Sequence, residues 1–170
     1  AGGRRLVDAL AAEGVEVVFG VPAAQTLPIY QGLRELAPAL AHVTARHEQG
    51  AGFMAEGFAR ATGRVGVACV VTGVGLGNVV TPMASALADS VPLLVVSSQV
   101  PTFWRDHPAR QYNHFLPRSS EGVAASVAKH SFRVERAADI YETIREAHAL
   151  ALAGRPGPVH VEAPVDVLAA

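Results

Sequence analysis

The stretch from residue 41 to residue 99 constrains the fold most, because short apolar runs alternate in it with longer segments of helical composition. The runs Ala41–Ala45, Val65–Val71 and Leu93–Ser97 have the length of buried strands. Between the first two, Gln49–Gly63 reads as a helix that is apolar around most of its circumference, so we expect burial on more than one side. This alternation is typical of parallel strand–helix–strand units.

The rest of the chain extends the same pattern to six strands. We expect further helices over Arg4–Gly14, Thr26–Leu36, Glu121–Ala128 and Asp139–Ala153, and further strands over Val15–Gly20, His130–Val134 and Val159–Ala163. The sequence therefore predicts an α/β fold, a three-layer α/β/α sandwich around a six-stranded parallel sheet. We expect one domain over residues 1–164, with the start of a linker at residues 165–170.

Composition and charge exclude several classes of protein. The formal net charge is −1 and no basic stripe is present, so the sequence gives no sign of nucleic-acid binding. The longest apolar run, Val91–Val96, is far shorter than the roughly 20 residues of a membrane span. The seven histidines show no metal-ligand spacing, so no metal site is expected within this chain. The chain also begins without a signal segment, from which we expect a cytoplasmic protein.

Four segments of the chain are expected to meet at one edge of the sheet. In open parallel sheets ligands bind beyond the carboxyl ends of the strands. That edge would carry the turn Pro22–Gln25, the acid Glu48, the glycine turn Thr72–Asn78, and Gln99. We therefore look for a binding site there.

Glu48 is the most informative of these residues, and two interpretations of it stay open. The structural one is a first-turn acid that stabilises the helix through its dipole. The functional one is a carboxyl that shares a proton with a nitrogen of a ligand. Glu48 has no basic residue four positions on, since position 52 is Gly52.

The glycine turn matches neither common nucleotide motif. Its glycines, Gly73, Gly75 and Gly77, have the wrong spacing for the dinucleotide fingerprint, and no lysine follows as in a phosphate-binding P-loop. The backbone here must approach something closely, either a neighbouring helix or a flat ligand. The long proline-rich loop at 100–118 similarly either covers a substrate or is simply solvated.

Five segments resemble, in chain order, the N-terminal pyrimidine-binding domain of thiamine diphosphate-dependent enzymes. They are VVFGVP at 17–22, RHEQGAGFMAEGFARATG at 46–63, TGVGLGN at 72–78, ADSVPLLVVSSQVP at 88–101 and GRPGPVHVEAP at 154–164. The resemblance is to acetolactate synthase-like enzymes and to 2-oxo acid decarboxylases of the 2-ketoarginine decarboxylase kind. It implies the thiamine diphosphate-binding fold.

The resemblance also implies roles for individual residues. Glu48 would be the catalytic acid that activates the cofactor through N1′ of its aminopyrimidine ring. The other cofactor-binding residues would be Pro22, Ala23, Ala24, Thr72, Gly73 and Asn78. The substrate side would be lined by Gln25, Gln99, Gln111 and Lys129.

What the sequence lacks completes this expectation. The family holds the cofactor's diphosphate and Mg²⁺ through a separate domain with a Gly-Asp-Gly motif, which this sequence does not contain. We therefore expect one domain of a homodimeric enzyme that decarboxylates or carboligates a 2-oxo acid, with the cofactor at the subunit interface and no activity in this fragment alone. The alternative is a non-catalytic assembly or regulatory domain, because Ala23, Ala24 and Val74 differ from the family's usual residues.

Overall fold

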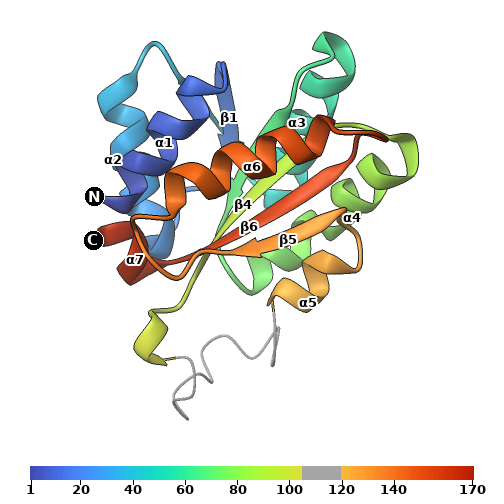
Figure 1. Cartoon of the computed structure of the whole chain (residues 1–170). Helices are drawn as coiled ribbons and strands as arrows, with labels where there is room; N and C mark the ends of the chain where they lie inside the picture. The colour runs from blue at the N-terminus through green and yellow to red at the C-terminus, as the bar shows by residue number, and fades with distance from the viewer. Residues whose placement is uncertain (105–119) are drawn as a thin grey trace.

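The computed structural model describes residues 1–104 and 120–170 and shows one parallel sheet of six strands between two layers of helices (Figure 1). The strands are β1 Val17–Gly20, β2 Ala41–Thr44, β3 Gly66–Val70, β4 Leu93–Gln99, β5 His130–Arg133 and β6 Pro158–Pro164. Their order across the sheet is β2-β1-β3-β4-β6-β5, and every neighbouring pair is parallel. The predicted fold class is confirmed.

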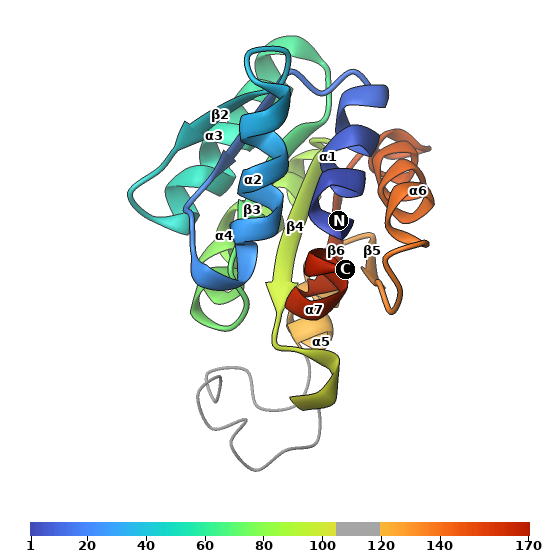
Figure 2. The same cartoon turned by 90° about the vertical axis from the view of Figure 1, so that its left-hand side faces the viewer.

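The two helix layers enclose separate hydrophobic cores. One face is covered by α1 Gly2–Ala12, α2 Leu27–Leu36, α6 Ile140–Leu152 and α7 Val165–Ala169. The other is covered by α3 Glu48–Thr62, α4 Val74–Asp89 and α5 Ser120–Ala125. Figure 2 shows α6 and α7 on one side of the molecule and α3 and α4 on the other. Two short 3₁₀ helices, η1 Ala24–Thr26 and η2 Thr102–Trp104, follow β1 and β4.

Helix α3 lies very close to the sheet and to α4 because small residues line both contacts. A Cβ atom on Gly66 would lie 2.0 Å from the Ala55 carbonyl oxygen, and one on Gly52 would lie 2.4 Å from Pro82. Burial on two sides is thus confirmed. A further side of α3 stays open, where Phe53 is 43% exposed and Gly57 has no neighbour within 4 Å.

The C-terminal segment corrects a sequence expectation. Residues 165–170, expected to begin a linker, contain helix α7, which packs against α1 and α2. Leu168 is fully buried, and the amide of Gly2 donates to the carbonyl of Ala170. The apolar pair Val167 and Leu168 completes the core at the sheet's edge, so this segment belongs to the domain.

No helix within residues 1–104 or 120–170 combines the length and the apolar character needed to cross a membrane.

Candidate functional site

The strand order brings the expected segments to the carboxyl edge of the sheet. The chain passes from β1 outward to β2 and then returns to the other side of β1 with β3. Crevices at such reversals are where open α/β sheets bind ligands. Strands β1, β2 and β3 all end at this edge, and the segments that follow them begin there, as the sequence predicts.

Glu48 is the first residue of α3 and is half-buried at this edge. His47 caps the helix, its Nδ1 accepting from the Gln49 amide at 3.2 Å. The Asn78 amide nitrogen donates to Glu48 Oε2 at 3.0 Å. Within the described ranges, 1–104 and 120–170, no hydrogen bond to Glu48 Oε1 is present. One carboxyl oxygen is therefore fixed by the protein, and the other accepts no hydrogen bond from the described residues.

The glycine turn meets Glu48 directly. Gly73 precedes α4 with φ +67° and ψ −113°, a conformation that essentially only glycine adopts. A Cβ atom on Gly75 would lie 2.7 Å from Val71 Cγ1 and 3.4 Å from Glu48 Oε1. Both alternatives for this turn thus have support, because its backbone packs against a neighbour and also borders the acid.

The turn after β1 is fixed by one buried hydroxyl. The Thr26 hydroxyl donates to the Ala23 carbonyl oxygen at 2.9 Å and accepts from the Ala23 amide at 3.0 Å. Pro22 and Ala24 remain exposed, and Ala23 and Gln25 are partly exposed. The turn therefore presents a rigid rim at the carboxyl edge.

Thr72 and Gln99 are bound to each other beneath this edge. Thr72 Oγ1 donates to Gln99 Oε1 at 3.1 Å, and both side chains are buried. Gln99 in turn donates to Glu162 Oε2 at 3.0 Å. Gln99 lies near the expected substrate side, but its amide group faces the protein.

One expected site residue, Lys129, is not brought to this edge. Lys129 precedes β5, at the amino edge of the sheet, where its Nζ donates to the carbonyl oxygens of Leu150 and Ala153 at the end of α6. Its placement on the substrate side therefore needs correction, because the lysine binds the exposed carbonyls of a helix C-terminus. Gln111 lies outside the described residues.

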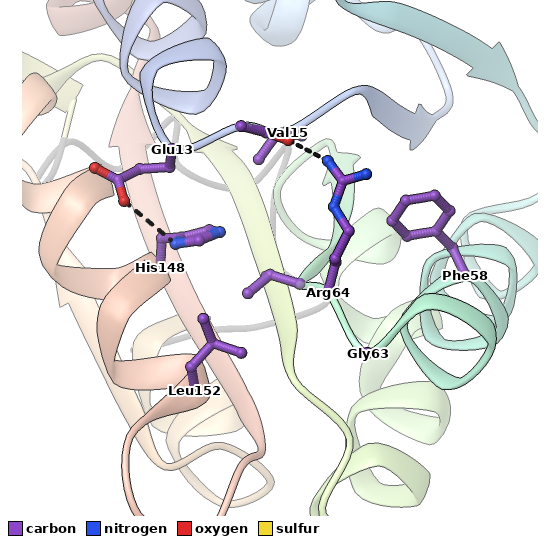
Figure 3. A pocket seen from close by; sticks show the side chains of 9 residues that line it. Glu13, Val15, Phe58, Gly63, Arg64, His148 and Leu152 are labelled. Atoms are coloured by element: carbon purple, nitrogen blue, oxygen red, sulfur yellow. Dashed lines mark hydrogen bonds and ion pairs between the residues drawn. The ribbon is translucent and has the colours of Figure 1, made fainter.

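A cavity of about 140 Å³ lies at the amino edge, away from Glu48 (Figure 3). Phe58, Arg64, His148 and Leu152 are among the residues that line it. Its charged groups pair within the protein, for Glu13 binds both Arg145 and His148. Burial lowers the pKa of His148.

Metal-ligating and nucleophilic groups do not gather in the described part of the chain. Residues 1–104 and 120–170 contain no group of three or more histidine, cysteine, aspartate or glutamate side chains that could hold a metal ion. Cys69 is buried, and burial raises the pKa of its thiol to about 12. It is therefore a neutral core residue rather than a nucleophile.

Sequence comparison identifies the protein family of the domain that carries this edge. Residues 1–116 match the family described as "Thiamine pyrophosphate enzyme, N-terminal TPP binding domain". The chain belongs to this family. Thiamine pyrophosphate is another name for thiamine diphosphate, so the resemblance carried by the five sequence segments is confirmed.

Several acetolactate synthases are similar to this chain. The chain is 41% identical over 166 residues to the probable acetolactate synthase large subunit of Methanocaldococcus jannaschii, covering 98% of this chain and 27% of that protein. It is 42% identical over 167 residues to the acetolactate synthase isozyme 3 large subunit of Escherichia coli, covering 98% and 28%. It is 40% identical over 169 residues to the mitochondrial acetolactate synthase catalytic subunit of Saccharomyces cerevisiae, covering 99% and 24%. The chain spans about a quarter of the length of these relatives.

Sequence reasoning missed Thr26 and Glu162 in this thiamine pyrophosphate-binding domain. A signal for Glu162 was present, since it is the one charged residue within the apolar run of the last strand. Charged residues are almost never fully buried unless they are paired. Thr26 gave no such signal, because a threonine near a helix start is common.

Proposed function

We propose that this domain holds the aminopyrimidine ring of thiamine diphosphate at its carboxyl edge, with Glu48 hydrogen-bonded to ring nitrogen N1′. The observation that carries the proposal is the state of the Glu48 carboxyl. One oxygen is held by Asn78 and the other, within the described residues, faces the edge beside Gly75 without a hydrogen bond. A carboxyl arranged in this way can exchange a proton with a heteroaromatic nitrogen.

The residues present fit a flat ring. Gly75 has no side chain to stand between the glycine turn and the Glu48 carboxyl, and Gly73 turns the chain into α4 with a positive φ. Thr72, Gly73 and Asn78 would then border the ring on one side, and Pro22, Ala23 and Ala24 on the other. When bound, the cofactor supplies the carbanion chemistry, while the protein supplies position and the proton at Glu48.

We further propose that the full-length protein decarboxylates or carboligates a 2-oxo acid. Support comes from the similar proteins, which are named as acetolactate synthase subunits. Gln25 is the expected substrate-side residue that lies partly exposed at the same edge as Glu48. The diphosphate and Mg²⁺ would be bound by another domain, consistent with a chain that spans about a quarter of its relatives.

A homodimer with the cofactor at the subunit interface is the assembly we propose. The exposed positions of α3 and α4 are nearly uncharged, and charge appears only at their far ends in the Arg60–Asp89 ion pair. Phe53 on α3 is 43% exposed, and Val74 at the start of α4 is 54% exposed. Apolar surface of this kind is typical of a face that another protein surface covers.

The non-catalytic alternative receives no specific support. The residues that motivated it, Ala23, Ala24 and Val74, are partly or fully exposed at the carboxyl edge.

Substitution of Glu48 in the full-length protein tests the proposal. Glu48→Gln keeps the shape and the Asn78 contact but removes the proton-exchanging group, so kcat should fall at least about 100-fold. Glu13→Gln, an acid at the opposite edge, serves as the matched control and should retain turnover. Steady-state kinetics with a 2-oxo acid, together with thiamine diphosphate titration in Mg²⁺, provide the measurement. Retained turnover in Glu48→Gln would remove Glu48 from the mechanism, and absence of saturable cofactor binding by the unmodified protein would overturn the proposed function.

A further inference from the structure

A chain of polar side chains, buried except for the partly exposed Arg133, crosses the sheet beneath the carboxyl edge and ends at the glycine turn. It consists of Arg133 on β5, Glu162 on β6, Gln99 on β4 and Thr72 after β3, and we call it the Glu162 network. We propose that this network positions the glycine turn against Glu48, so that Glu162 and Gln99 are positioning residues for the cofactor site. This inference rests on the proposed function.

Glu162 is the anchor of the network because its buried carboxylate engages two of the other three members. Its side chain is fully buried, in register with Ser97 on β4 and Arg133 on β5. Oε2 accepts from Gln99 Nε2 at 3.0 Å, and Oε1 lies 3.4 Å from the Arg133 guanidinium. A buried carboxylate that loses a partner is strongly unfavourable, so it holds its donors firmly in place.

The neighbours of Gln99 fix the direction of its amide group. Its Oε1 accepts from the Val100 amide at 2.8 Å and from Thr72 Oγ1 at 3.1 Å, while its Nε2 donates to Glu162. A backbone amide can only donate and a carboxylate can only accept, so turning the amide over would break both of these bonds. Glu162 and the Val100 amide together fix which atom of Gln99 faces the glycine turn.

Thr72 carries this constraint into the turn. Besides its bond to Gln99, the Thr72 amide donates to the Ser98 hydroxyl at 3.3 Å. Thr72 is thus attached twice to the end of β4, directly before the strained Gly73 that starts α4. Asn78 lies on α4 and donates to Glu48. The turn is therefore held at one end by the Glu162 network and at the other by Glu48.

A carboxylate is required at position 162 because both of its oxygens face donors. In Glu162→Gln the amide must turn its NH₂ either towards Gln99 Nε2 or towards the Arg133 guanidinium. Either orientation opposes two donors and leaves a buried group unsatisfied. The conservative variant therefore loses either its bond to Gln99 or its pairing with Arg133, and we expect it to hold Gln99 and the turn less firmly.

The same sheet provides a matched control two residues away. His160 on β6 is buried and contacts Ser131 at Nδ1, 2.7 Å, and Ser97 at Nε2, 2.8 Å. None of these three side chains contacts the glycine turn among the hydrogen bonds of residues 1–104 and 120–170. Ser131→Ala therefore breaks a buried hydrogen bond on the same strands without touching the Glu162 network.

The test measures cofactor affinity and amide hydrogen exchange in the full-length protein. In Glu162→Gln the thiamine diphosphate dissociation constant in Mg²⁺ should rise about tenfold, and amides in the 72–79 segment of the cofactor-free protein should exchange faster. In Ser131→Ala the dissociation constant should change by less than about twofold, even at an equal loss of thermal stability. Unchanged affinity and exchange in Glu162→Gln overturn the inference, as does an equal loss of affinity in Ser131→Ala.

A second pair of variants covers the case in which Glu162→Gln does not fold. Thr72→Val removes only the hydroxyl donor to Gln99, whereas Thr72→Ser keeps it. We expect faster exchange and weaker cofactor binding in Thr72→Val than in Thr72→Ser, and equal behaviour of the two variants overturns the inference. If the unmodified protein itself fails to bind thiamine diphosphate, the proposed function fails, a result distinct from any of these.

Discussion

The two edges of the sheet differ in how the protein treats the ends of its helices. At the amino edge, basic side chains bind the carbonyl oxygens that helices leave free at their C-termini. Lys129 binds carbonyls at the end of α6, and Arg155 binds those of Leu87 and Ala88 in α4. At the carboxyl edge, the start of α3 instead presents the acid Glu48, half-buried and held by one amide.

This difference separates stability from function within one fold. At the amino edge the charged groups pair with other groups of the protein. Glu13, which lines the cavity there, contacts both Arg145 and His148. The carboxyl edge keeps an available carboxyl oxygen, a glycine turn and exposed apolar side chains. Changes at the amino edge should therefore alter stability alone, and changes at the carboxyl edge should alter cofactor binding.

Two glycines with positive φ, one at each edge, give the strongest test of this separation. Gly73→Ala forces a side chain into a conformation that only glycine tolerates, so the full-length protein should lose about 2 kcal/mol of cofactor binding, a rise in Kd of about 30-fold. Gly63→Ala, at φ +72° and with no neighbour within 4 Å, should cost about 1 kcal/mol of folding stability and leave Kd unchanged. Cofactor titration and denaturant unfolding measure the two effects. An equal loss of affinity in both variants would contradict the separation of the edges.

Between the two edges, the buried His160 should make stability depend on pH. Burial lowers its pKa to about 3, whereas in the unfolded chain the pKa is about 6.5. Below pH about 6.5 His160 therefore becomes protonated in the unfolded state but stays neutral in the folded state. The free energy of unfolding should fall by about 1.4 kcal/mol per pH unit from this group, from about pH 6.5 down to about pH 3.

Denaturant unfolding of His160→Gln across the upper part of this window isolates that contribution. Glutamine can bond to Ser97 and Ser131 but does not titrate, so its stability should depend less steeply on pH. Parallel pH dependence in the variant and the unmodified protein would show that His160 does not carry the effect.

The smallest expected effect concerns Lys129 at the amino edge. Lys129→Met removes the donor to the carbonyls of Leu150 and Ala153 and should cost about 1 kcal/mol of folding stability, measured by denaturant unfolding. Lys129→Arg keeps the charge and serves as the control. If Lys129→Met instead lowers kcat/KM without a loss of folding stability, Lys129 acts on the substrate and the expected structural role is wrong.

Much of the fold could be predicted because its signals are local. The strands appeared as short apolar runs and the helices as longer periodic ones, and all six expected strands are present. Most element ends moved by one or two residues, as in α3, where capping by His47 depends on local geometry, and the end of α5 moved by three. The segment 165–170 was misjudged, since only its contacts with α1 and α2 show that it is part of the core.

The sequence by itself determined the parallel α/β architecture and the position of an acid at the head of a buried helix. Only the tertiary structure decided what that acid meets. Asn78 reaches Glu48 from 30 residues along the chain, Glu162 reaches Gln99 from 63 residues, and Lys129 turns to a helix end instead of the site. The physical reason is range: strand and helix patterns depend on residues a few positions apart, whereas these contacts depend on how separate elements pack across the sheet.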